Sequence, residues 1–140
     1  MKIILIIALF VCVQTQMVLA QAVPNLLERA RASIQAGNAE AAVQELTELL
    51  KTDTSNADAF ATRAHAYIKL GNYGASLADS SRATAISPNF GWAYYLHGIA
   101  SYWRTDKDFR GAMADFTKVI ALDPQLAFEA YRFRADIHNQ

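Results

Sequence analysis

The sequence predicts an all-α protein built as a stack of antiparallel helix pairs. Similar short sequence segments recur every 34 to 36 residues, which is the period of a helix-turn-helix unit. The 140-residue chain has only three prolines and six glycines, too few for many short strands and their turns. Apolar residues between these breaks recur at helical spacing. We therefore expect about three helix pairs followed by one C-terminal helix.

The repeat is clearest at its breaks. Gly37-Asn38 returns as Gly71-Asn72, and Ala85-Ile86-Ser87-Pro88 returns as Ala121-Leu122-Asp123-Pro124. The two extra residues of the last unit fall in the charged segment 105–108, a turn in which an insertion costs little. The predicted units are 23–56, 57–90 and 91–126.

Each unit is predicted to hold two helices. In the second unit, residues 57–70 contain no glycine or proline, Gly71-Asn72 ends that helix, and residues 73–86 form the return helix before Pro88. Phe60, Ala64 and Tyr67 share one face at i, i+4 and i+7. Small residues recur where the helices must approach closely, at Ala30, Ala64 and Gly98 in the first helices and at Ala42, Ser76 and Ala112 in the second.

Residues 127–140 are predicted to form the first helix of a fourth unit. This helix has two apolar stripes on nearly opposite sides, Phe128/Tyr131/Ala135 and Ala130/Phe133/Ile137. One stripe packs on the preceding pair, and the other would need a return helix. We expect Phe133 and Ile137 to form the outer stripe, which docks against a second copy, giving a homo-oligomer, or against the partner. A fragment of a longer chain, or a small tolerated patch, are the alternatives.

The first twenty residues resemble a secretory signal peptide. Lys2 precedes an apolar run from Ile3 to Val13, and Val18-Leu19-Ala20 offers small residues for cleavage after Ala20, with cleavage after Ala22 as the alternative. An uncleaved anchor is the alternative, but a helix of this run spans about 16 Å, half the hydrocarbon thickness. We therefore expect an exported protein, periplasmic or secreted. Its mature domain, 21–140, would contain no cysteine and no membrane span.

The net charge and the pattern of histidines and acidic residues exclude several classes of function. The 13 basic residues balance 13 acidic ones, so no basic field attracts nucleic acid. The three histidines, His65, His97 and His138, follow the spacing of the repeat and form no metal motif. Asp79 and Asp115 recur at equivalent positions, which indicates a shared surface feature. We expect no enzyme activity, no metal site and no cofactor.

These units resemble the tetratricopeptide repeat family. The second unit matches its pattern of aromatic, small and turn residues at Phe60, Ala64, Gly71, Tyr73, Ser76, Ala83 and Pro88, and the third at Tyr94, Gly98, Phe109, Ala112, Val119 and Pro124. The first unit lacks the aromatics and the proline. The resemblance implies a right-handed superhelix in which the first helix of each unit lines a concave groove. It also implies a protein or peptide partner and no catalysis.

Carried over residue by residue, the groove positions select eight candidate partner-binding residues. They are Arg31, His65, Lys69, Trp92, Tyr95, Ile99, Tyr102 and Trp103. The five from Trp92 to Trp103 fall within about 100° of arc on one helix. Tyr and Trp are well suited to anchor a partner, but the same residues also serve as packing. Both interpretations stay open.

Three functions remain. The leading one is a non-catalytic scaffold that binds a peptide or an envelope protein in the groove. The alternatives are a glycan- or small-ligand-binding protein that uses the aromatic residues, and a structural assembly subunit. The family's carboxylate clamp, which holds acidic C-terminal tails, is absent, because its positions are occupied here by Leu27, Arg31, Thr62, Trp92 and Leu96.

Overall fold

The computed structural model describes residues 25–140, and within that range the secondary structure is entirely helical. The helices are α2 (Leu26–Gln35), α3 (Ala39–Thr52), α4 (Ala57–Lys69), α5 (Tyr73–Ile86), α6 (Gly91–Trp103), α7 (Phe109–Leu122) and α8 (Ala127–His138). The predicted all-α stack of antiparallel helix pairs is confirmed. The predicted signal peptide, 1–20, lies outside the described residues. In the described range, no helix combines the length and the apolar character that crossing a membrane requires.

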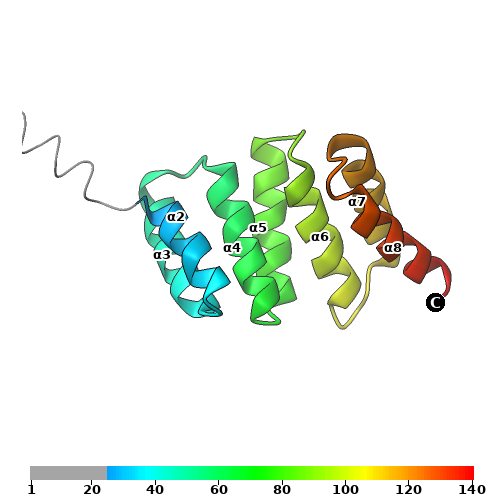
Figure 1. Cartoon of the computed structure of the whole chain (residues 1–140), viewed down its shortest axis with the longest axis horizontal. Coiled ribbons are helices and arrows are strands. Elements are labelled where there is room, and N and C mark those ends of the chain that lie inside the picture. The colour runs from blue at the N-terminus through cyan, green and yellow to red at the C-terminus, as the bar shows by residue number, and fades with distance from the viewer. Residues whose placement is uncertain (1–24) are drawn as a thin grey trace, which may run out of the picture.

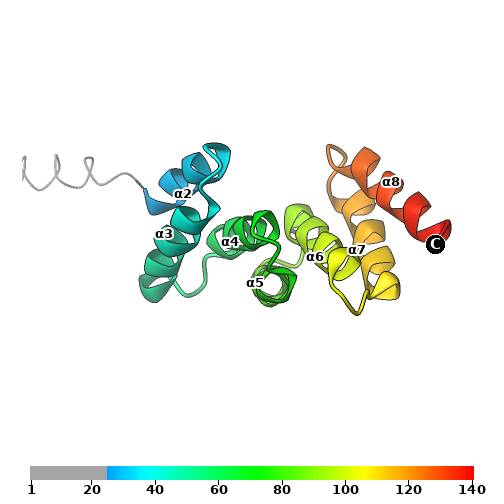
Figure 2. The same ribbon diagram turned by 90° about the horizontal axis from the view of Figure 1, so that it is seen from below.

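The helices form a curved row. Figure 1 shows them side by side in chain order, from α2 at one end to α8 at the other. Figure 2 shows α2, α4, α6 and α8 along one side of the row and α3, α5 and α7 along the other. Contacts between α2 and α4, and between α4 and α6, make this first side continuous. The first helices of the three pairs therefore line one common face.

Local signals set the helix boundaries. Gly37 and Gly71 follow the ends of α2 and α4 with φ of 80° and 72°, a left-handed conformation that suits glycine. The asparagine after each glycine caps the next helix. The Asn38 side chain accepts from the Ala41 amide at 3.2 Å, and that of Asn72 from the Ala75 amide at 3.1 Å. The recurring Gly-Asn pair is thus a chain reversal that also starts a helix.

Small residues allow the helices to pack closely. Alanines at the crossings are fully buried, including Ala30, Ala42, Ala64 and Ala112. At Gly98 a β-carbon would lie 3.0 Å from the ring of Phe116, so any side chain there would push that ring away by a few tenths of an ångström. Buried residues of α2 to α6 form one apolar cluster, and Tyr102, Ala130 and the buried residues of α7 form a second.

A basic and an acidic side chain meet across each helix pair at the same position of the repeat. Arg29 binds Glu45 at 3.0 Å, Arg63 binds Asp79 at 2.7 and 2.8 Å, and His97 contacts Asp115 at 2.7 Å. The prediction that Asp79 and Asp115 are surface features is therefore wrong for Asp79, which is buried. The acidic residue recurs in the sequence because each repeat has a basic residue opposite it on the facing helix.

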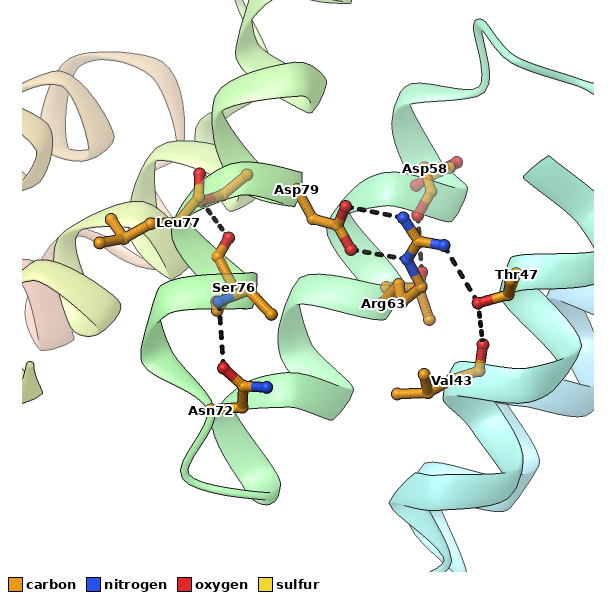
Figure 3. A network of polar contacts seen from close by, with 11 residues as sticks. Val43, Thr47, Asp58, Arg63, Asn72, Ser76, Leu77 and Asp79 are labelled. Atoms are coloured by element: carbon orange, nitrogen blue, oxygen red, sulfur yellow. Dashed lines mark hydrogen bonds and ion pairs between the residues drawn. The ribbon is translucent and has the colours of Figure 1, made fainter. Parts of the chain in front are cut away.

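The middle pair also connects two units. Arg63 Nη1 donates to Thr47 Oγ1 of α3 at 3.1 Å, and that hydroxyl donates to the Val43 carbonyl at 2.7 Å. Figure 3 shows the guanidinium held between Asp79 and Thr47. Hydrogen bonding to Asp79 raises the pKa of Arg63 despite the opposing effect of burial. One side chain thereby joins α3, α4 and α5.

The C-terminal helix presents the opposite face to the one predicted. Ala130 is fully buried, and the ring of Phe133 stacks on Phe116 with centroids 4.9 Å apart. Ile137 packs against the same cluster. The outer stripe is Phe128 and Tyr131, which are 70% and 56% exposed. The predicted association through Phe133 and Ile137 therefore loses its basis, because these side chains complete the core beneath α8.

Candidate functional site

The common face of α2, α4 and α6 contains a pocket of about 270 Å³, which we call the groove pocket. Its lining residues come from these three helices and from the residue that precedes α6. They are Arg31, Ile34, Gln35, Asp58, Thr62, His65, Phe90 and Trp92. Apolar side chains supply its walls, and the remainder is polar. A site of this size accommodates one side chain of a ligand along with a short stretch of backbone.

Three aromatic side chains form a continuous wall at this pocket. The rings of His65 and Trp92 meet at nearly a right angle with centroids 5.4 Å apart, and Trp92 stacks on Tyr95 at 5.5 Å. Trp92 is half-buried and packs against the core cluster of α2 to α6. Neighbours on both sides therefore hold the indole in place while part of it stays open. Such a fixed aromatic surface loses little entropy on binding.

The predicted aromatic stripe does not continue along α6 as one open surface. Phe133 of α8 lies between Tyr95 and Tyr102, with ring centroids 6.2 and 5.5 Å away. Tyr102 is only 5% exposed, and its hydroxyl donates to Asp136 of α8. Tyr102 is therefore a packing residue that fixes the rotation of α8, and Ile99 packs in the same cluster.

Trp103 stands apart from the groove pocket. It is 53% exposed, and its ring meets that of Tyr102 at nearly a right angle with centroids 5.0 Å apart. The eight candidates thus separate into three sets. Arg31, His65 and Trp92 line the pocket with Tyr95 behind them, Ile99 and Tyr102 are covered by α8, and Lys69 and Trp103 lie exposed beyond the pocket.

Arg31, the cation of the groove pocket, is already paired. It contacts Glu28 at 2.7 Å and Asp58 at 3.3 Å. On α8, Arg132 is likewise bound by Glu129 at 2.9 Å. Among the described residues, Lys69 forms no ion pair and is exposed. The pocket therefore offers an incoming carboxylate no free guanidinium.

His65 is held in its neutral form. Burial lowers the pKa of His65, and the positive charge of Lys69 lowers it further. A neutral imidazole against the indole makes this part of the wall apolar at physiological pH. The pocket thus combines an aromatic wall, a neutral histidine and paired charges. This suits an apolar side chain better than a charged one.

Two parts of this face were missed by sequence reasoning. Phe90 lines the pocket but precedes α6 at its N-cap position, so it has no place in a helical stripe. A second depression of about 500 Å³ lies on α8 and is lined by Glu129, Arg132, Phe133, Ala135, Asp136 and Asn139. Its charged residues Glu129, Arg132 and Asp136 follow one side of α8 at helical spacing. This spacing was the feature of the sequence that could have predicted the depression.

Comparison with known proteins supports the repeat. Residues 57–90 match the family model described as tetratricopeptide repeat. The human protein SGT1 homolog is 33% identical over 89 residues, which is 64% of this chain and 24% of that protein. The chain thus spans about a quarter of that relative.

Solved structures share the fold. The first tetratricopeptide domain of Spaghetti (RPAP3), bound to the HSP90 peptide SRMEEVD, has a TM-score of 0.76 and 24% identity over 81% of this chain and 88% of that one. The second such domain of human RPAP3, in complex with the HSP70 peptide SGPTIEEVD, has a TM-score of 0.73 and 25% identity over 81% and 92%. This chain therefore has the fold of tetratricopeptide solenoids.

The comparisons contradict the predicted localisation. The similar proteins, which include the DnaJ homolog of Dictyostelium discoideum and RNA polymerase II-associated protein 3 of Xenopus tropicalis, are chaperone cofactors of the cytosol and nucleus and are not exported. The prediction of a periplasmic or secreted protein rested on the apolar run from Ile3 to Val13, outside the described residues. The repeats, which carry the similarity, did not enter that prediction.

Proposed function

We propose that this chain is a non-catalytic scaffold that binds a peptide segment of another protein in the groove pocket. The observation that carries the proposal is the wall of His65, Trp92 and Tyr95, which is braced from behind and open toward the pocket. A fixed indole beside a cavity for one side chain is the geometry of an anchor site. The peptides in the two solved structures of the same fold support a peptide as the class of ligand.

We propose further that the anchor of this peptide is a large apolar or aromatic side chain. The peptides SRMEEVD and SGPTIEEVD of the similar structures end in acidic residues. The positions of an acid-binding clamp hold Leu27, Thr62, Trp92 and Leu96 here, and Arg31 is already paired with Glu28 and Asp58. If Arg31 left these two ion pairs to bind a carboxylate of the peptide, it would exchange one ion pair for an equivalent one. The affinity for the peptide would therefore rise little.

A glycan ligand has less support. A sugar ring needs an open aromatic face, but Trp92 stacks one face on Tyr95 and also makes an edge-to-face contact with His65. Converging carboxylates are also needed, and the nearest one, Asp58, is bound to Arg31. The peptide hypothesis uses the open part of the wall and requires no charge to be released.

Selection from a random peptide library on the full chain tests this function. We expect enriched peptides with one aromatic or large aliphatic side chain at a fixed place. Trp92→Ala should weaken binding of a selected peptide at least tenfold, whereas Trp103→Ala, with its indole outside the pocket, should change it less than twofold. Enrichment of acidic C-terminal sequences would contradict the apolar anchor, and no enrichment would contradict peptide binding itself.

A further inference from the structure

His65 places a titratable ring in the wall of the groove pocket. The ring is half-buried, lies against Trp92 with centroids 5.4 Å apart, and lines the pocket. Arg31 and Asp58 also line the pocket, but they form an ion pair with each other at 3.3 Å. Among the side chains that line this pocket, His65 is therefore the one whose charge changes between neutral pH and mild acid.

The charged groups around His65 come from two helices. On α4, Lys69 follows His65 by one turn and Asp58 precedes it by two turns. Arg31 faces the pocket from α2, and Trp92 of α6 brings no charge. The ion pair of Arg31 with Asp58 leaves Lys69 as the charge without a partner among the described residues around this ring. Burial and the charge of Lys69 both lower the pKa of His65.

An apolar side chain in the pocket would cover the exposed part of the imidazole. Apolar atoms that replace water around an ionisable group disfavour its charged form. The contact of His65 with Trp92 and the ion pair of Asp58 with Arg31 exist already in the free chain, so binding adds nothing there that offsets this cost. An apolar ligand therefore binds the chain with a neutral His65 more tightly than the chain with a protonated one.

We propose that protonation of His65 expels the peptide, so that the chain holds its ligand at neutral pH and releases it in mild acid. This release rests on the proposed function, because it requires an apolar anchor in the groove pocket. The coupling is reciprocal: the ligand lowers the pKa of His65 further, and the proton weakens the ligand. Each pH unit below the pKa of the free chain reduces the affinity by up to about tenfold, until the pKa of the complex is reached.

The affinity at two pH values tests this release. The full chain is titrated calorimetrically with a selected peptide that has blocked ends and no titratable side chain. We expect the dissociation constant of the wild type to be at least about threefold higher at about pH 5 than at about pH 7.5. His65→Gln should show no such rise. The matched control is His138→Gln, which alters an exposed ring at the end of α8 and should keep the rise. Thermal melts in both buffers confirm that each chain is folded.

The ring signals of His65 in NMR give a second readout, which decides the matter if His65→Gln binds too weakly to measure. In the wild type, the pKa of His65 should be lower with saturating peptide than without it. Lys69→Gln removes a charge that disfavours the protonated ring, so it should move the loss of affinity to a higher pH.

Two results would overturn the release and leave the proposed function standing. One is a selected peptide that binds the folded wild type equally well at both pH values. The other is a loss of affinity in acid that persists in His65→Gln. Selection that yields no peptide at all would overturn the proposed function and the release together.

Discussion

Arg63 and Asp79 form a two-pronged ion pair between α4 and α5, with N–O distances of 2.7 and 2.8 Å. The same two positions of the neighbouring units hold Arg29 with Glu45 and His97 with Asp115. Of the three basic residues, Arg63 also reaches the preceding pair, through Thr47. Each helix pair thus has a polar contact between its two helices, and the contact of the middle pair also connects that pair to the preceding one.

Loss of the Arg63 cation should destabilise the fold strongly. Arg63→Met leaves Asp79, whose side chain is 8% exposed, buried without its partner, and we expect the free energy of unfolding to fall by about 3 kcal/mol. Arg63→Met with Asp79→Leu should recover most of that loss, because no charge remains buried. Urea denaturation measures both.

The first unit supplies the control. Arg29 is 51% exposed, so Arg29→Met should cost less than about 1 kcal/mol. Equal losses at Arg29 and Arg63 would show that the middle pair has no special role.

Two glycines should respond to alanine with opposite signs. A β-carbon at Gly98 meets the Phe116 ring at 3.0 Å, so Gly98→Ala should lower stability by about 1–3 kcal/mol. At Gly74, in α5, the nearest atom is 4.0 Å away, and Gly74→Ala should raise stability by about 0.5–1 kcal/mol. Thermal melts of both variants check this, and a stable Gly98→Ala protein would mean that α6 and α7 separate easily.

The two stripes of α8 should differ in their effect on stability. Phe133 packs among Tyr95, Tyr102 and Phe116, so Phe133→Ala should cost about 3 kcal/mol. Phe128→Ala, on the outer stripe, should cost less than about 0.5 kcal/mol. Denaturation of dilute protein compares them without interference from association. The reverse order would restore the face that the sequence predicted.

His65 should make the fold less stable in mild acid. Its pKa is lower in the folded chain than the unfolded value of about 6.5, so the unfolded chain binds the proton more readily. The contribution of His65 to the free energy of unfolding is fully present above a pH of about 6.5, and it is lost as the pH falls toward the lowered pKa.

The difference between variants isolates this effect. His97 and His138 are present in both the wild type and His65→Gln, so the difference in their urea midpoints across pH reports His65 alone. Lys69→Gln, which removes the nearby charge, should reduce the wild-type loss. A loss in acid that is the same with and without His65 would contradict a neutral His65 in the fold.

The breaks in the sequence predict the helices well because their signals are local. Gly71-Asn72 and Pro88 place helices at 57–70 and 73–86, and the structure has them at Ala57–Lys69 and Tyr73–Ile86. The glycine conformation and the asparagine cap both depend on a few adjacent residues. Such signals need no knowledge of the rest of the fold.

The orientation of α8 could not be predicted in the same way. Its sequence carries two apolar stripes, and the choice between them depends on the rings of Tyr95, Tyr102 and Phe116 on other helices. The same contacts bury Tyr102 and divide the predicted aromatic stripe. His65 and Trp92 were placed correctly on one face, but their contact at 5.4 Å depends on how α4 and α6 cross.

The most direct test of the groove pocket is a titration of the full chain with a selected peptide, followed by NMR of the two tryptophan indole N–H groups. Trp92 and Trp103 give one signal each and lie inside and outside the pocket. We predict that the Trp92 signal and the His65 ring signals shift and saturate together, while Trp103 stays within the range of a buffer control. Saturating shifts at Trp103 or along α8, with Trp92 and His65 unchanged, would contradict the proposed site.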